Sequence, residues 1–273
     1  MSKVLHNTKF INEKAKFVRS SLFEKFVLTK QGHPGSVFSM VDLAASLYYG
    51  GFIRKDDENN SPFKDKVIVS KGHATATLYP ILVDLGIIDI DIWNKWGSDE
   101  TMLRVFGNIS IPGIDVTSGS LGHGLGIAAG FAESFKRKKN DNKVFVFLSE
   151  GELYEGSCWE SLLYISSNRL DNINIILDRN SLMILGNTED CVELDPIDEK
   201  LKGFGIEVYS CNGHDTSDIL LNYEKMNASN KPTCLIAKTI KGKGVSFMEN
   251  KAHWHYWNPL DETQIKQARQ DLS

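Results

Sequence analysis

Two apolar runs constrain the fold of this chain more than any other feature of its sequence. The runs Val144 to Leu148 and Ile173 to Leu177 show no regular alternation between apolar and polar residues. A strand with one face in solvent alternates in this way, whereas a strand covered on both faces does not. We therefore expect a mostly parallel sheet with helices on both of its faces.

The rest of the chain alternates between strand-like and helix-like segments, as in doubly wound α/β domains. Apolar residues at helical spacing predict helices over residues 11–30, 38–49, 78–88, 156–169 and 218–226. Strands are predicted from residue 65 to a turn at Gly72 and His73, and over residues 143–148, 173–177, 206–210 and 233–240. The chain has 273 residues, 41% of them hydrophobic, which is enough for one large core. We expect a single domain over residues 1–273.

Charge, cysteine content and hydropathy exclude several classes of protein. The formal net charge is −4, and the Lys-rich stretches at 136–140 and 238–247 are short and separate, so we expect no nucleic acid partner. The four cysteines include no CxxC pair, which argues against a zinc site and a disulfide framework. No apolar run approaches the length of a membrane span. We expect a cytoplasmic protein that does not associate with membranes.

Two residues with side-chain oxygens follow the ends of neighbouring predicted strands. Glu150 follows the run that ends at Leu148, and Asn180 follows the next strand, thirty residues further on. Ligands of open parallel sheets bind beyond the carboxyl ends of the strands, so both side chains can face one crevice. One ionised and one neutral oxygen donor suit a hard cation such as Mg²⁺, whose remaining ligands are commonly phosphate and water.

A glycine-rich stretch from Gly119 to Gly126 leads into a predicted helix. Backbone N–H groups at a helix start bind phosphate, so this stretch completes a predicted metal-assisted diphosphate site. Taken singly, Glu150 is more simply a solvated residue at a helix start, and Asn180 a turn former. Their joint spacing favours the site.

The sequence around these residues resembles a known family. The thiamine diphosphate signature, which begins Gly-Asp-Gly and ends in Asn, is similar to SEGELYEGSCWE followed by DNINIILDRNSLMILG. The N-terminal part of transketolase is similar, in the same order, to KQGHPGSVFSMVDLAASLYY, VIVSKGHATATLYPIL, PGIDVTSGSLGHGLGIAAGFA and KTIKGKGVSFMENKAHWHYW. The resemblance covers nearly the whole chain. It implies the N-terminal, thiamine diphosphate-binding subunit of a split transketolase.

The resemblance implies a metal site and a diphosphate site. The metal, Mg²⁺ or else Ca²⁺ or Mn²⁺, would be bound by Glu150, Asn180 and the backbone carbonyl of Leu182. Gly151 would lie against the diphosphate, and Asn180 would also contact the cofactor. Further cofactor contacts are implied for Gly119, Leu121 and Glu155. Glu155 and Glu160 also match family glutamates that lie near a dimer interface.

Three histidines match catalytic positions of the family. His73 and His255 match histidines near the diphosphate and the substrate entrance, and His33 matches one that contacts substrate hydroxyls. Neutral imidazoles can move protons between sugar hydroxyls near neutral pH. The alternative for each is a structural histidine hydrogen-bonded near a loop, and the Gly-His turns at His33 and His73 favour the catalytic interpretation.

Several positions depart from the family pattern. Glu150 replaces the metal-binding Asp and is longer by one methylene, about 1.5 Å of reach. Ser149 replaces the first glycine of the signature, and Arg179 precedes Asn180. Val105 or Phe106 stands where the family has a histidine that touches the donor sugar, which points to a changed donor, a changed acceptor or weak activity.

The implied reaction transfers a two-carbon ketol unit from a ketose to an aldose, with sugar phosphates as the family default. In this family a pyrimidine-binding domain supplies the glutamate that activates the cofactor, and no segment here resembles that domain. We therefore expect a partner subunit with the pyrimidine-binding and C-terminal domains, in a heterotetramer with this chain.

Two alternatives remain open. A degenerate, non-catalytic paralogue that binds or regulates a partner is consistent with Ser149, Glu150 and the missing histidine. An ordinary dinucleotide-binding domain is less consistent, because no strand is followed by GxGxxG with an acidic residue at the expected distance.

Overall fold

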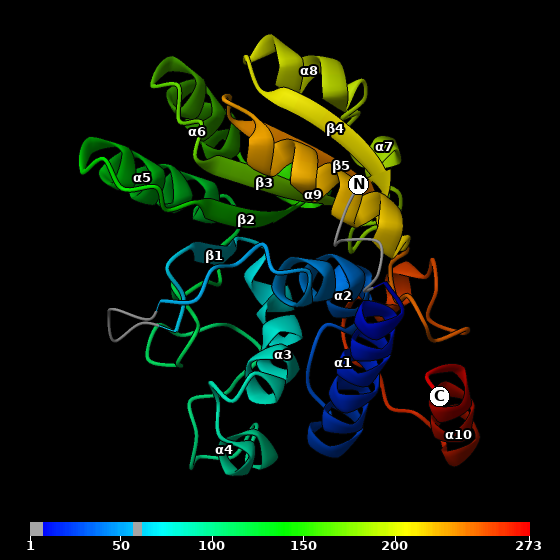
Figure 1. The fold of residues 1–273 in the computed structure, drawn as a ribbon. Coiled ribbons are helices and arrows are strands. Elements are labelled where there is room, and N and C mark those ends of the chain that lie inside the picture. Colours follow the sequence, from blue (N-terminus) through cyan, green and yellow to red (C-terminus); the bar gives the residue numbers. More distant parts are fainter. Residues whose placement is uncertain (1–7, 57–61) are drawn as a thin grey trace.

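The computed structural model describes residues 8–56 and 62–273. Its centre is a five-stranded sheet in which every neighbouring pair of strands is parallel (Figure 1). In spatial order the strands are β1 (Lys66–Val69), β2 (Val144–Ser149), β3 (Ile173–Arg179), β5 (Thr233–Lys238) and β4 (Glu207–Asn212). The predicted parallel sheet is therefore confirmed, and its two unalternated apolar runs form the central strands β2 and β3.

Helices cover both faces of this sheet (Figure 1). Val144, Val146 and Leu148 of β2 belong to one apolar cluster, whereas Phe145 and Phe147 belong to the other. The first cluster includes residues of α5 (Gly124–Arg137), α6 (Gly156–Ser167) and α8 (Ile197–Gly203). The second includes residues of α1 (Thr8–Thr29), α2 (Pro34–Tyr49), α3 (Leu78–Asp84) and α9 (Thr216–Ala228). Both clusters are buried, which confirms the doubly wound α/β class and explains why these strands show no polar alternation.

The short elements of the fold were not predicted from the sequence. They are α4 (Ile90–Asn94), α7 (Thr188–Cys191), α10 (Glu262–Asp271) and the 3₁₀ helices η2 (Gly72–Thr77), η3 (Glu150–Tyr154) and η4 (Ala252–His255). A few residues give too little periodicity to recognise, and the longer α10 buries only Ala268. Its start carries a local signal instead, because Asp261 and Gln264 form a capping box.

Strands β1, β2, β3 and β5 end at the same edge of the sheet. In the register of the sheet Val69 lies opposite Phe147, and Ser149 lies opposite Asp178. The residues that follow these ends are therefore brought together although they are distant in sequence. Among the residues described, no helix is both long and apolar enough to cross a membrane.

Candidate active site

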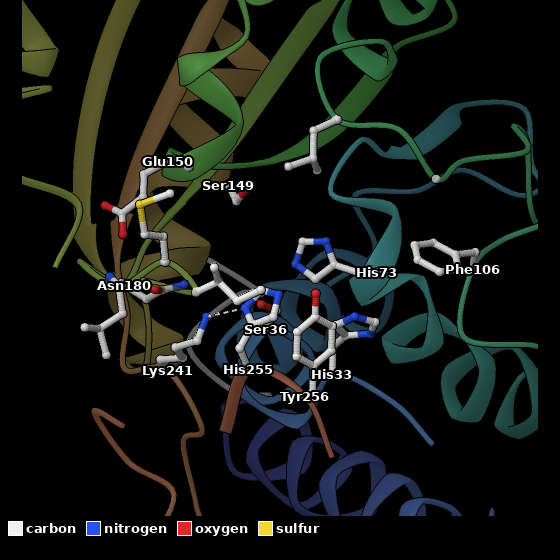
Figure 2. Close-up of a pocket in the computed structure, with 16 residues that line it drawn as sticks. His33, Ser36, His73, Phe106, Ser149, Glu150, Asn180, Lys241, His255 and Tyr256 are labelled. Carbon is white, nitrogen blue, oxygen red and sulfur yellow. Dashed lines mark hydrogen bonds between the residues drawn. The ribbon is translucent and has the colours of Figure 1, made fainter. Parts of the chain in front are cut away.

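A cavity of about 330 Å³ lies at this edge of the sheet (Figure 2). Of the residues predicted to form the site, those that line the cavity are His33, His73, Gly119, Leu121, Glu150, Gly151, Asn180, Leu182 and His255. They come from the start of α2, from the segments after β1, β2 and β3, and from η4. The structure thus brings together nearly all of the predicted site residues in one pocket.

The three predicted catalytic histidines form one cluster on one side of this pocket (Figure 2). The ring centroid of His33 lies 5.2 Å from that of His73 and 5.4 Å from that of His255, and the last two are 5.4 Å apart. His33 occupies the position before α2, where Pro34 starts the helix, and His73 lies in η2 directly after β1. The Nδ1 atom of His33 is buried without a hydrogen-bond partner, so it is available to a ligand.

These histidines are held in the neutral form. Burial, and then the charge of Lys241, lowers the pKa of His33 to about 4 and that of His255 to about 3. Burial also lowers the pKa of His73 well below its ordinary value, with a further contribution from Lys71. At neutral pH all three imidazoles are therefore uncharged and can accept a hydrogen bond.

Lys241 is a site residue that the sequence analysis missed. It lies three residues beyond the end of β5 and lines the pocket with its side chain otherwise buried. Its Nζ atom is 3.2 Å from Nδ1 of His255, and burial lowers its pKa to about 8. A lysine just past a buried strand was the available signal. The signal was missed because residues 238–247 contain several lysines, and the sequence does not show which of them is buried.

A buried ion pair between Lys71 and Asp178 links the segments that carry the two sides of the pocket. Lys71 donates to Asp178 and, at 3.0 Å, to the carbonyl of Ser36, and both charged side chains are fully buried. Asp178 also accepts hydrogen bonds from the hydroxyls of Ser39 and Thr239. Because Lys71 is two residues before His73 and Asp178 two before Asn180, this pair connects the histidine side to the carboxylate side.

Glu150 and Arg179 form an ion pair at the opposite side of the pocket. Nη1 of Arg179 lies 2.5 Å from Oε2 of Glu150, and Nη2 of Arg179 contacts Glu189 at 2.5 Å and Asp195 at 3.1 Å. Glu150 is 1% exposed, and burial raises its pKa to about 7 in spite of the opposing charge of Arg179. Two departures from the family pattern, at positions 150 and 179, are thus partners in one contact.

The residues present fit a divalent cation held mainly by oxygen. Oε1 of Glu150 is buried and has no hydrogen-bond partner, so it is free to bind a metal. The side-chain oxygen of Asn180 lies nearby, where it accepts from the N–H of Leu182 at 3.2 Å. The residues described contain no group of three or more His, Cys, Asp or Glu side chains that could hold a metal. A mixed set of one carboxylate, one amide and one carbonyl, completed by ligand oxygens, remains and suits Mg²⁺.

The glycine-rich loop contributes two residues to the pocket lining. Gly119 and Leu121 line the cavity, and the N–H of Gly122 donates to Oε1 of Glu152 at 2.8 Å. The same oxygen accepts from the hydroxyl of Ser70 at the end of β1. A buried carboxylate thus ties the loop to the sheet, and α5 begins directly after it at Gly124.

Glu155 was predicted to contact the cofactor, but it does not line the cavity. It is exposed at the start of α6, as is Glu160 within that helix. Conversely, besides Lys241, the cavity lining includes six residues to which the sequence analysis assigned no cofactor or catalytic role, namely Ser36, Phe106, Ser149, Met183, Ile184 and Tyr256. Phe106 and Tyr256 flank His33, with ring centroids 5.9 and 5.0 Å from it. They come from loops whose course no local pattern predicts.

A family comparison agrees with this geometry. Residues 12–273 match the family model described as transketolase, thiamine diphosphate binding domain. The chain belongs to this transketolase family. The predicted family is confirmed, and so is the predicted enzyme class, a thiamine diphosphate-dependent transketolase-like transferase.

Individual transketolases are similar to most of the chain. An apulose-4-phosphate transketolase subunit from Phocaeicola vulgatus is 35% identical over 256 residues, which are 93% of this chain and 91% of that protein. A 6-deoxy-6-sulfo-D-fructose transketolase subunit from Clostridium sp. (strain MSTE9) is 32% identical over 256 residues, 92% of each protein. The structure of transketolase from Campylobacter jejuni matches with a TM-score of 0.89 at 27% identity, covering 97% of this chain and 43% of that chain.

Proposed function

We propose that residues 1–273 act as the diphosphate-binding domain and subunit of an enzyme that transfers a two-carbon ketol unit from a ketose to an aldose. It would use thiamine diphosphate and a divalent metal, with Mg²⁺ as the first choice. The observation that carries the proposal is the single pocket in which three neutral histidines face a buried carboxylate with one free oxygen.

One side of the pocket would bind the metal, and the other would bind the diphosphate through a lysine. Oε1 of Glu150, the amide oxygen of Asn180 and the carbonyl of Leu182 would hold the metal, and Gly151 lies among them without a side chain. The cation of Lys241 would offset the charge of the diphosphate from the other side. Metal and lysine together supply the positive charge that an anion needs in a buried site.

The histidines act on the substrate side. When bound, thiamine diphosphate supplies the nucleophilic carbon and the electron sink for carbon–carbon cleavage. His33, with its free Nδ1 atom, would orient the substrate and accept a proton from one of its hydroxyls, and His73 and His255 would pass protons within the cluster. Phe106 places an apolar ring beside His33. Because Val105 or Phe106 stands where the family usually has a histidine, we infer a donor specificity that differs from the family default.

The catalytic unit would include a second polypeptide. Relatives matched over nine-tenths of their own length are named as transketolase subunits, which supports a partner chain. We infer a heterotetramer with a partner that carries the pyrimidine-binding and C-terminal domains, located in the cytoplasm. The substrates would be phosphorylated or otherwise anionic sugars, as the names of these relatives suggest.

Calorimetry tests the cofactor and metal assignment. Thiamine diphosphate should bind the chain, with its partner present, in Mg²⁺ but not in excess chelator. Glu150→Ala should abolish this binding, whereas Asp198→Ala, which removes an exposed carboxylate on α8, should not change it. Unchanged affinity in Glu150→Ala or in chelator would disprove the metal site, and no binding by the unaltered chain would favour the non-catalytic paralogue.

A further inference from the structure

A buried chain of contacts outside the pocket ends at the residue before Lys241. Asp42 of α2 accepts from Arg19 of α1 through both carboxylate oxygens, at 3.0 Å for Oδ1. Its Oδ2 atom lies 2.6 Å from Nδ1 of His214. The Nε2 atom of His214 accepts from the backbone N–H of Ile240 at 2.8 Å. The side chains of Arg19, Asp42 and His214 are each about one-tenth exposed, so these contacts are shielded from water.

The partners of His214 determine its tautomer. A backbone N–H can only donate, so Nε2 must carry a lone pair, and the ring proton must be on Nδ1, where it points to Asp42. Neutral histidine with this tautomer satisfies both neighbours at once. The two ring nitrogens of a neutral histidine thus accept from Ile240 and donate to Asp42 from fixed positions on one rigid ring.

The segment that His214 contacts carries the pocket lysine. Ile240 is adjacent to Lys241, whose Nζ atom meets His255 in the cavity. On the other side of Lys241, the N–H of Gly242 donates to the carbonyl of Gly35 at 2.9 Å. Gly35 lies in the first turn of α2, which follows His33. Residues 240–242 are therefore attached to α2 at two points, through Asp42 and through Gly35.

We infer that His214 is a positioning residue which, oriented by Asp42, fixes the backbone at Ile240 and so places the ammonium group of Lys241 in the pocket for the diphosphate of the cofactor. This inference rests on the proposed function for the identity of the anion. The placement of Lys241 is independent of the proposed function, because it follows from the contacts of His214 and Lys241.

Two substitutions separate this role from a general contribution to stability. In His214→Gln the side-chain amide reaches about as far as Nε2 of the histidine, so it can still accept from the N–H of Ile240. It no longer makes the hydrogen bond to Asp42. Asn reaches only as far as Nδ1, so it can donate to Asp42 but leaves the N–H of Ile240 without a partner. Tyr223→Phe is the matched control, because it removes a different buried hydrogen bond to α2, from the Tyr223 hydroxyl to the carbonyl of Leu43 at 3.1 Å.

The experiment has two readouts on the full chain. Hydrogen-exchange mass spectrometry over residues 239–242 should show exchange about tenfold faster in His214→Asn, the change expected for one lost hydrogen bond, and near the unaltered rate in His214→Gln and Tyr223→Phe. Calorimetry with inorganic pyrophosphate and Mg²⁺ should show affinity lowered about tenfold in His214→Asn and within about threefold in the other two. All three variants should have a lowered melting temperature. Because only His214→Asn should also exchange faster and bind pyrophosphate more weakly, general destabilisation does not explain these two changes.

The outcomes separate this inference from the proposed function. If His214→Asn exchanges and binds as the unaltered chain does, or if His214→Gln loses as much affinity as His214→Asn, the positioning role is wrong. If the unaltered chain binds no pyrophosphate or thiamine diphosphate, the proposed function is wrong. The exchange rates still decide whether His214 holds the segment before Lys241.

Discussion

His33 and His255 share the pocket with Lys241, and this arrangement determines which protons the site can hold. Burial first and the lysine second lower their pKa values to about 4 and about 3. Lys241, whose pKa burial lowers to about 8, is mostly protonated at neutral pH, while the imidazoles remain free to accept a hydrogen bond. These imidazoles stay uncharged in mildly acidic conditions, in which an exposed histidine becomes protonated.

These shifts predict that the chain loses stability in acid. In the unfolded chain a histidine has a pKa near 6.5, so between about pH 6.5 and pH 4 the unfolded state binds more protons than the folded state. The free energy of unfolding should fall as the pH is lowered through this window. Urea unfolding at pH 7 and pH 5 checks this, and the fall should be smaller in His33→Gln. An equal fall in that variant would show that His33 is not a buried neutral base.

Glu150 and Arg179 should behave as one unit. Glu150→Asp shortens the side chain by one methylene, which keeps a carboxylate for the metal but withdraws it from Arg179. We expect thiamine diphosphate binding to remain dependent on metal, and the free energy of unfolding to fall by about 1–3 kcal/mol, as for a lost hydrogen bond to a charged group. Urea unfolding and calorimetry on the same samples test this. Full loss of binding would mean that the metal site is built around the longer side chain.

At the scale of elements, one glycine of the loop and one of α5 test whether the loop conformation controls cofactor binding. Gly122 has φ +84°, and a Cβ atom there would lie 2.5 Å from the Ser157 hydroxyl and 2.7 Å from Cβ of Glu155. Gly122→Ala should therefore displace the loop that lines the pocket and weaken thiamine diphosphate binding at least tenfold. It should also lower the free energy of unfolding by about 1–3 kcal/mol, as expected for strained backbone.

Gly130→Ala, in the helix that follows the loop, is the matched control. A Cβ atom at Gly130 would meet no other atom within 4 Å, and the residue lies inside α5. Alanine favours a helix interior over glycine by about 0.5–1 kcal/mol, so this variant should be slightly more stable, and the isolated variant should bind the cofactor as the isolated unaltered chain does. Thermal unfolding and calorimetry compare the two variants. Equal binding by both would show that the loop conformation does not control the pocket.

At the scale of the whole molecule, α6 presents apolar side chains to solvent beside an open groove. Leu163 is 62% exposed, and Tyr164 lines the groove with Gly126, Gly130 and Ser161. Exposed apolar residues on a helix next to a groove of small residues are typical of a surface that another protein chain covers. This location, next to the glycine loop, is consistent with a partner that completes the site.

We therefore predict that the chain alone does not turn over ketose donors, and that activity requires the partner. Leu163→Asp should leave the isolated chain as stable as before and weaken the complex at least tenfold. Leu221→Asp, at a residue 50% exposed on α9, should weaken neither. Light scattering and a ketol-transfer assay on the co-expressed chains provide the measurements. Turnover by the purified chain with added thiamine diphosphate would contradict the requirement for a partner.

The sequence by itself determined the order of the main elements and half of the pocket. Continuous apolar runs marked the buried strands, and Glu150 and Asn180 followed those runs at positions that a parallel sheet must bring to one edge. Glycines marked the phosphate-binding loop. Each of these signals is local, because side-chain periodicity and backbone freedom depend on neighbours a few residues away.

Only the tertiary structure decided which charged groups meet. Asp42 and His214 are separated by 172 residues, and Lys71 and Asp178 by 107, so no local pattern could pair them. Arg179 is visible in the sequence as a departure from the family, but its contact with Glu150 depends on the register of β2 and β3. Lys241 is one of several lysines in its stretch, and only burial against α2 distinguishes it. Electrostatic interactions depend on distance and exclusion of water, and both are established only when the chain has folded.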